Sequence, residues 1–288
     1  MIEERPGRTV ETEIVRYEGE RGARTHDRVV TEEPLELRLA AGGVTRTLAV
    51  TMRTPGNDFE LAAGFVTSER IVRSREEIAT ISYCVDPAID PEQRYNIVNL
   101  ELTRAALPDL TQFERHFTMN SSCGVCGRAN LEALASLGVE PVDDDVRVPM
   151  ARIYELPDRM REAQRVFAAT GGLHAAALFD ADGKALAVRE DVGRHNAVDK
   201  LAGWALLEGR ALAGTLLFVS GRASYEILQK AAVARIPIVC SVSAPSSLAV
   251  ELARAFNITL VGFVRGERAN VYSASIRVDD PAQPRHLR

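Results

Sequence analysis

The sequence has few cysteines, no long apolar run and no excess of basic residues. Four cysteines among 288 residues are too few to build a disulfide-stabilised secreted fold. Nowhere do about 18 apolar residues follow one another, which argues against a membrane-spanning helix. The first 20 residues are polar and lack the apolar core of a signal peptide. We therefore expect a cytoplasmic protein whose thiols stay reduced.

The charge balance is mildly acidic, with 35 Lys and Arg residues against 40 Asp and Glu residues and a formal net charge of −5. This balance argues against a protein coated with basic side chains for nucleic-acid binding. Hydrophobic residues make up 46% of the chain and charged residues 26%, as in ordinary globular proteins. A chain of this length can bury a substantial core as one large or two modest domains.

The first half of the chain predicts a small α+β unit with an antiparallel sheet. Leu35–Leu39 alternates apolar and charged residues, as a half-buried strand does, and Leu48–Met52 repeats the pattern. The pair Gly42–Gly43 between them supplies a hairpin turn. A helix over about residues 59–70 and strands near 78–85 and 95–102 are expected to follow.

In the second half, helices and apolar strands alternate. A helix is predicted over Pro157–Ala169, with the proline in its first turn, and Gly171–Gly172 is expected to end it. A hairpin (174–180 and 185–190), strands 215–220, 236–240 and 258–263, and helices 196–207, 224–234 and 246–255 are expected after it. This alternation predicts a partly parallel sheet covered on both faces. An acidic stretch near Val142–Met150 predicts the domain boundary, with domains at 1–145 and 146–288.

The sharpest local motif is the C-x-x-C pair Cys123 and Cys126, which is flanked by glycines. Two thiols at this spacing can share a metal, form a disulfide or pass sulfur between them. A zinc site normally needs further ligands, and only His116 lies nearby, so a partial metal site stays open. The polar flanks predict a loop, where a nearby cation such as Arg128 lowers a thiol pKa. Incidental cysteines in a flexible loop are the alternative.

The remaining cysteines, Cys84 and Cys240, lie inside apolar, strand-like runs and are predicted to be core residues. His174 opens a predicted strand and is interpreted as a structural histidine. The segment Glu190–Lys200 gathers polar and charged side chains around a strand-to-helix turn. A capped helix start explains only part of that cluster.

Two turns at predicted strand ends are candidates for ligand binding. Ser220–Arg222 and Ser243–Ser247 each follow an apolar strand and precede a helix. In open α/β sheets, ligands bind beyond the carboxyl ends of strands, where helix N-termini attract anions. Ordinary helix caps are the alternative interpretation. The chain has no Walker loop and no G-x-G-x-x-G, which excludes a standard nucleotide fingerprint.

Taken together, these segments resemble the FdhD family, the formate dehydrogenase accessory sulfurtransferases. The similar motifs occur in order between about Pro34 and Val278: Ser121–Gly127, Thr170–Ala176, Glu190–Lys200, Ser220–Glu226, Ser243–Ala249 and Leu260–Gly266. Six motifs in register are far more specific than a single C-x-x-C pair.

The resemblance implies an enzyme, a sulfurtransferase with a cysteine persulfide intermediate. Family members accept sulfur from a cysteine desulfurase and transfer it to the molybdenum bis(molybdopterin guanine dinucleotide) cofactor, which formate dehydrogenase requires. Cys123 matches the persulfide position and Cys126 the second cysteine. GDP is expected to mimic part of that acceptor, and no metal of the protein's own is expected. The expected cofactor-binding residues are Phe263, Val264, Arg265, Gly266, Glu267 and Arg268 from the family stretch, with Ser220, Gly221, Arg222 and Ser243 from the two turns.

The resemblance also implies a cytidine-deaminase-like three-layer α/β domain, a smaller N-terminal α+β domain and a homodimer. Its partners would be the desulfurase and the formate dehydrogenase catalytic subunit, with neither nucleic acid nor a membrane among them. Zinc deaminases use H-x-E and P-C-x-x-C, where this chain has His195–Ala197 and Ser220–Arg222, so deamination is not expected. Two alternatives remain: a non-catalytic cofactor-binding chaperone, or a C-x-x-C redox or metal protein.

Overall fold

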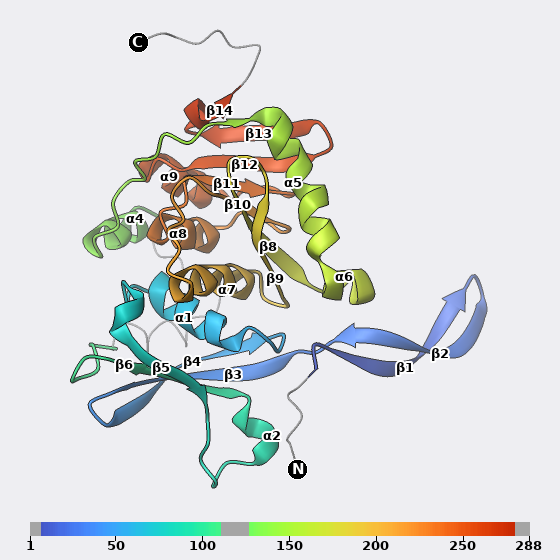
Figure 1. Ribbon diagram of the computed structural model, residues 1–288. Helices are drawn as coiled ribbons and strands as arrows, with labels where there is room; N and C mark the ends of the chain where they lie inside the picture. The colour runs from blue at the N-terminus through green and yellow to red at the C-terminus, as the bar shows by residue number, and fades with distance from the viewer. Residues whose placement is uncertain (1–6, 111–126, 280–288) are drawn as a thin grey trace.

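The computed structural model describes residues 7–110 and 127–279, which form a mixed α/β structure with helices between two sheets (Figure 1). The smaller sheet has four strands in the order β4-β3-β6-β5, with β3 and β6 parallel. Its strands are β3 (Glu33–Ala41), β4 (Val44–Arg53), β5 (Ile78–Tyr83) and β6 (Ile97–Leu102). Helix α1 (Asp58–Ser68) packs on one face and shares a leucine-rich core with the sheet.

The predicted hairpin is confirmed as β3 and β4, and both turn glycines, Gly42 and Gly43, have positive φ angles. The alternation predicted for the second strand is wrong beyond its first residue. Leu48 is buried, but Val50 and Met52 are 58% and 46% exposed. A register shift beside Leu37 leaves both Leu48 and Ala49 buried, so the residues after them change faces.

The larger sheet has six strands in the order β13-β12-β11-β10-β8-β9, and its central strands β10, β11 and β12 are parallel. They are β8 (His174–Phe179), β9 (Ala185–Asp191), β10 (Leu216–Val219), β11 (Ile238–Ser241), β12 (Thr259–Arg265) and β13 (Arg268–Ser273). Helices α7 (Arg194–Leu207), α8 (Tyr225–Val233) and α9 (Ser247–Ala255) cover one face, and α5 (Met150–Ala163) covers the other (Figure 1). Apolar side chains form a core on each face, which confirms the partly parallel, doubly covered sheet.

The helix predicted from Pro157 begins earlier and is divided in two. Pro157 lies inside α5, where buried Ile153, Leu156 and Met160 hold one face against the sheet and outweigh the missing N–H of the proline. Gln164 then interrupts the helix, and α6 (Arg165–Thr170) follows. Gly171 ends α6 in a left-handed conformation, as predicted.

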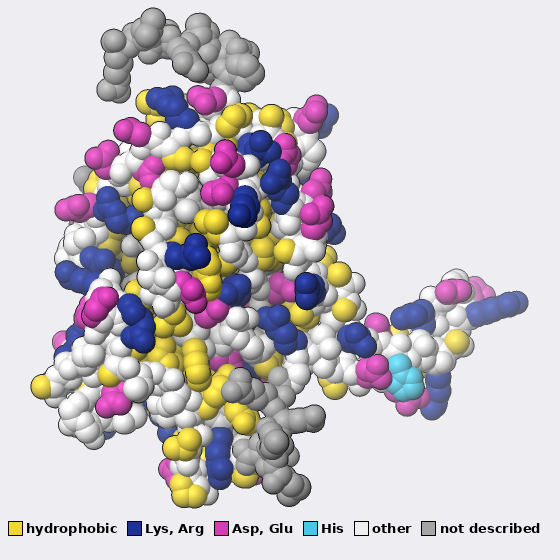
Figure 2. Space-filling view, in the orientation of Figure 1, with side chains coloured by type: hydrophobic (Ala, Val, Ile, Leu, Met, Phe, Trp, Pro, Cys, Tyr) yellow, Lys and Arg dark blue, Asp and Glu magenta, His cyan; other side chains and the backbone are white. Residues whose placement is uncertain are grey.

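A two-stranded ribbon that the sequence did not reveal projects from the body (Figure 1). It consists of β1 (Thr9–Glu18) and β2 (Arg21–Val30), paired antiparallel along their whole length. Charged side chains cover much of its surface (Figure 2). The minor elements are η1 (Arg75–Glu77), α2 (Pro91–Arg94), α4 (Gly127–Ser136), β7 (Val148–Pro149), η2 (Ser275–Arg277) and β14 (Val278–Asp279). Within the two described ranges, no helix is both long and apolar enough to cross a bilayer.

The two sheets are joined through direct contact between α1 and α7, which lie side by side (Figure 1). A methyl group added at Gly64 would lie 1.8 Å from the carbonyl oxygen of Asp199, and one at Gly203 would lie 1.8 Å from that of Glu60. The helix backbones therefore touch, which only glycine permits at these positions.

Candidate functional site

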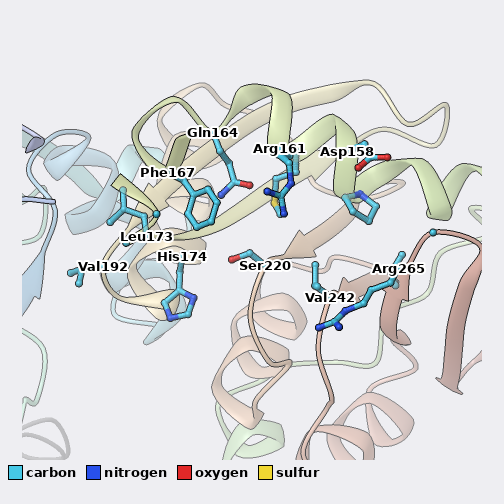
Figure 3. Close-up of a pocket in the computed structure, with 16 residues that line it drawn as sticks. Asp158, Arg161, Gln164, Phe167, Leu173, His174, Val192, Ser220, Val242 and Arg265 are labelled. Atoms are coloured by element: carbon cyan, nitrogen blue, oxygen red, sulfur yellow. The ribbon is translucent and has the colours of Figure 1, made fainter. Parts of the chain in front are cut away.

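A cavity of about 700 Å³ lies beyond the carboxyl ends of the parallel strands (Figure 3). Ser220 follows β10 and Val242 follows β11, while Val264–Gly266 comes from the end of β12. The facing wall consists of α5, α6 and the residue between them, which contribute Asp158, Arg161, Phe167 and Gln164. The segment 171–174 and Val192 complete the lining. This volume falls within the range of about 300–1,000 Å³ that small-molecule sites occupy.

Two arginines give the cavity a cationic lining from opposite walls. Arg161 lies on α5, where its guanidinium carbon is 5.9 Å from the centroid of the Phe167 ring. Arg265 lies at the end of β12, and Figure 3 shows its side chain turned toward Val242. The Ser220 hydroxyl accepts a hydrogen bond from the Ala175 N–H at 2.9 Å, which leaves its own proton free to donate. Arginines and a hydroxyl at strand ends suit a phosphate-bearing ligand.

His174 lines the same cavity and is held in its neutral form. Burial lowers its pKa, the Arg194 guanidinium lowers it further, and Asp191 opposes both effects. A neutral imidazole can donate one hydrogen bond and accept another, depending on its tautomer. His174 therefore adds polar contacts to this wall without adding a charge at neutral pH.

The segment that ends β12 has a strained backbone. Phe263 has a φ angle of 55°, a left-handed conformation that is unusual for an aromatic residue. Its N–H donates to the carbonyl oxygen of Ser243 at 3.2 Å, and the Ser241 hydroxyl donates to the same oxygen at 2.8 Å. These bonds fix the Ser243 turn against the segment that carries Val264 and Arg265 into the cavity wall. Strain of this kind is concentrated at functional sites.

The residues predicted to bind the cofactor fall into three groups in the structure. Four line the cavity: Ser220, Val264, Arg265 and Gly266. Three lie next to that lining: Gly221 beside His174, and Ser243 and Phe263 through the bond described above. Three are exposed and outside the lining: Arg222, Glu267 and Arg268.

The two predicted catalytic cysteines, Cys123 and Cys126, lie outside the described residues, as does His116. Cys84 and Cys240 are buried free thiols, which confirms their predicted place in the core. Burial raises the pKa of the Cys240 thiol far above its usual range, which makes it a poor nucleophile. Among the described residues, no three His, Cys, Asp or Glu side chains are grouped to hold a metal.

The polar segment Glu190–Lys200 connects the larger sheet to the smaller one. Lys200 is fully buried, and its ammonium group lies 2.6 Å from the Asp191 carboxylate and 3.0 Å from the Thr54 carbonyl oxygen. The Asn196 amide donates to Asp191 at 2.9 Å and to the Met52 carbonyl oxygen at 2.8 Å. This network fixes the turn that places Val192 in the cavity wall.

A second polar cluster lies at the start of α7. His195 Nε2 is 3.4 Å from the Ser224 hydroxyl and 3.7 Å from the Glu226 carboxylate. Burial lowers the pKa of His195 to about 4, and the neighbouring Arg194 adds to that effect. The cluster does not line the cavity described above, and its histidine is neutral at physiological pH.

Sequence reasoning missed the helical wall of the cavity. Arg161, Gln164 and Phe167 fall inside the single helix predicted over Pro157–Ala169, and nothing in their spacing marks a site. The one available signal was their position immediately before the Thr170–Ala176 motif. Their convergence on Arg265, about a hundred residues further along the chain, depends on the sheet topology.

The fold and cavity define a class: a mixed α/β protein with a cationic, ligand-sized cavity at the ends of parallel strands. A profile described as the FdhD/NarQ family matches residues 30–279. A "Sulfur carrier protein FdhD" from Streptomyces avermitilis is 50% identical over 256 residues, covering 88% of this chain and 89% of that protein. One of the same name from Mycobacterium tuberculosis is 49% identical over 255 residues, covering 87% and 91%.

A solved structure supports the same assignment. The crystal structure of a putative formate dehydrogenase accessory protein from Desulfotalea psychrophila superposes with a TM-score of 0.73 at 25% identity. The match covers 94% of this chain and all of that one. The chain belongs to the FdhD/NarQ family.

Proposed function

We propose that this protein is a sulfurtransferase that serves formate dehydrogenase. It accepts persulfide sulfur from a cysteine desulfurase and transfers it to the molybdenum bis(molybdopterin guanine dinucleotide) cofactor, which is the acceptor substrate. Family membership supports sulfur transfer in general. The proposed acceptor is supported by the cavity. Its volume and its opposed arginines, Arg161 and Arg265, suit a guanine nucleotide with its phosphates.

The proposed chemistry begins at Cys123. Its thiolate attacks the terminal sulfur of the donor's persulfide, the donor's S–S bond breaks, and the donor cysteine leaves as a thiolate. Cys123 then carries the extra sulfur as a persulfide. Cys126 assists or resolves this persulfide. Cys240 takes no part, because burial raises its pKa and keeps it protonated.

A mass-spectrometric experiment tests the persulfide. The full chain is incubated anaerobically with a cysteine desulfurase and cysteine, and the peptide that holds Cys123 is examined for the mass of one added sulfur atom. The adduct is expected in the wild type and in the Cys84→Ala control, and it is expected to be absent in Cys123→Ala. No adduct on Cys123 in the wild type would exclude the persulfide role.

The cavity alone is also consistent with a chaperone that binds the cofactor without transferring sulfur, since its described lining needs no cysteine. That alternative predicts that Cys123→Ala still activates formate dehydrogenase in a reconstitution assay. Metal analysis of anaerobically purified protein addresses the third possibility, a redox or metal protein that uses the cysteine pair. Stoichiometric zinc or iron would favour it.

The finer points of architecture and location belong to the same proposal. The mixed sheet with α7–α9 on one face and α5 on the other is compatible with a cytidine-deaminase-like three-layer domain. We further propose a cytoplasmic homodimer. Light scattering of the purified full chain, giving the mass of one or two chains, tests the dimer.

A further inference from the structure

The side-chain amide of Gln164 faces the cavity and has no hydrogen-bond partner among the described residues. The residue is 5% exposed and lines the cavity. Its backbone is satisfied, because its N–H donates to Arg161 at 3.1 Å and its carbonyl oxygen accepts from Ala168 at 3.0 Å. Within the described chain, no group makes a hydrogen bond to the side-chain amide, whose atoms stay open to the cavity. The donor and the acceptor of this amide are therefore available to a ligand that enters the cavity.

The position of this amide is fixed by the sheet. Gln164 is the single non-helical residue between α5 and α6, with φ −81° and ψ 76°. The buried Glu190 carboxylate, near the end of β9, accepts the N–H groups of Val166 at 3.1 Å and Phe167 at 2.7 Å. This carboxylate caps the start of α6 and thereby holds both Gln164 and Phe167 at the cavity wall.

The residues around the amide indicate that the ligand carries a flat ring. Arg161, Gln164 and Phe167 extend from the helical wall toward the opposite wall, where Ser220, Val242 and Arg265 lie (Figure 3). Phe167 offers an aromatic surface for stacking. The carboxamide of Gln164 offers a donor and an acceptor side by side, which match the paired groups on the edge of a nucleobase.

We propose that Gln164 is the specificity-determining residue that binds the edge of the ligand's base, while Phe167 stacks on the ring. The inference rests on the proposed function, in which a guanine nucleotide occupies the cavity. The amide N–H donates to guanine O6, and the amide oxygen accepts from guanine N1–H. Arg265, on the opposite wall, contacts the phosphates. Gln164 takes no part in sulfur transfer; it orients the ligand that accepts the sulfur.

The test compares two ligands in the full-length protein by calorimetric titration. GDP carries both base and diphosphate, whereas inorganic pyrophosphate carries only the anionic part. Gln164→Leu is expected to weaken GDP binding about 10-fold, because losing a pair of hydrogen bonds to a base typically costs about that much affinity. Pyrophosphate binding is expected to stay unchanged. Arg265→Gln is expected to weaken both ligands. Gln229→Leu on α8, outside the cavity lining, makes the same chemical change as a control.

Thermal unfolding adds an independent readout. Replacing an amide that makes no hydrogen bond to the protein with an apolar side chain of similar size is expected to leave Tm nearly unchanged. Gln164→Met, with an unbranched side chain of similar length, serves if the leucine variant folds poorly. Reduced GDP binding together with an undiminished Tm distinguishes a ligand contact from a structural role.

The possible failures are distinguishable. If the wild type binds GDP and the Gln164 variants bind it equally well, the role of Gln164 is overturned while the cavity assignment stands. Equal losses for GDP and pyrophosphate would mean a general disturbance of the cavity and would also overturn it. A wild type that binds neither ligand would overturn the proposed nucleotide site itself.

Discussion

Removal of the buried Lys200 ammonium group should strongly destabilise the protein. Lys200 and Asp191 both have 0% exposure, and their charged atoms lie 2.6 Å apart. Asp191 also accepts the Thr54 N–H at 3.2 Å, and Lys200 donates to the Thr54 carbonyl oxygen at 3.0 Å. Burial lowers the pKa of Lys200, while Asp191 opposes that shift.

The expected cost follows from the charge left behind. In Lys200→Met, the Asp191 carboxylate keeps its hydrogen bonds but loses its only buried countercharge among the described contacts. Breaking a buried ion pair in this way typically costs about 3–5 kcal/mol. Total stabilities of about 5–15 kcal/mol make that a large fraction. In the double variant Lys200→Met with Asp191→Asn no charge is stranded, so we expect it to recover much of the loss.

Urea denaturation at neutral pH measures these free energies of unfolding. Lys184→Met, which removes an exposed lysine, is the matched control and should change stability by less than about 0.5 kcal/mol. A free energy of unfolding of Lys200→Met within about 1 kcal/mol of the wild type would contradict this prediction. It is also refuted if the two single losses simply add in the double variant.

Three further predictions concern a close helix contact, a buried thiol and a half-buried histidine. Gly203→Val should lower Tm clearly, because its side chain would meet the Glu60 carbonyl oxygen; an unchanged Tm would contradict the close helix contact. Cys240 should resist alkylation in the native state and react in urea, because burial raises its thiol pKa; rapid native labelling by mass spectrometry would argue against this. His195 has a pKa lowered from 6.5 to about 4, so the unfolded chain binds its proton first as the pH falls. Stability should therefore decrease from about pH 6.5 toward pH 4, and less steeply in His195→Gln, as urea midpoints would show.

Much of the second half was predictable because its strands are short apolar runs that alternate with helices. The strands around Leu216–Val219 and Ile238–Ser241 agree with expectation to within two residues. Pro157 misled the helix assignment, since tertiary packing of Ile153 and Met160 outweighs a lost hydrogen bond. The ribbon β1–β2 was missed because both of its faces are largely exposed and carry charges, which removes the apolar alternation that marks a strand.

The residues of the candidate site were predictable only where a local sequence pattern marks them. Ser220 directly follows β10, so the rule that ligands bind at strand ends could find it. Arg265, the last residue of β12, was expected from the family resemblance. Gln164 and Phe167 reach the cavity because Glu190, on a strand further along the chain, caps α6. No local pattern encodes that contact. The lone irregular residue between two helices becomes meaningful only when the amide is seen facing a cavity.

The contact between Gly64 and Gly203 has a mechanical consequence. Because α1 and α7 touch through their backbones, no side chains lie between them that could allow the helices to slide. Ser68 on α1 and Lys230 on α8 also bind the Asp199 carboxylate of α7, at 2.7 and 2.8 Å. The two sheets cannot rotate against each other without exposing these charges. They should therefore melt together, as a single endotherm in calorimetry.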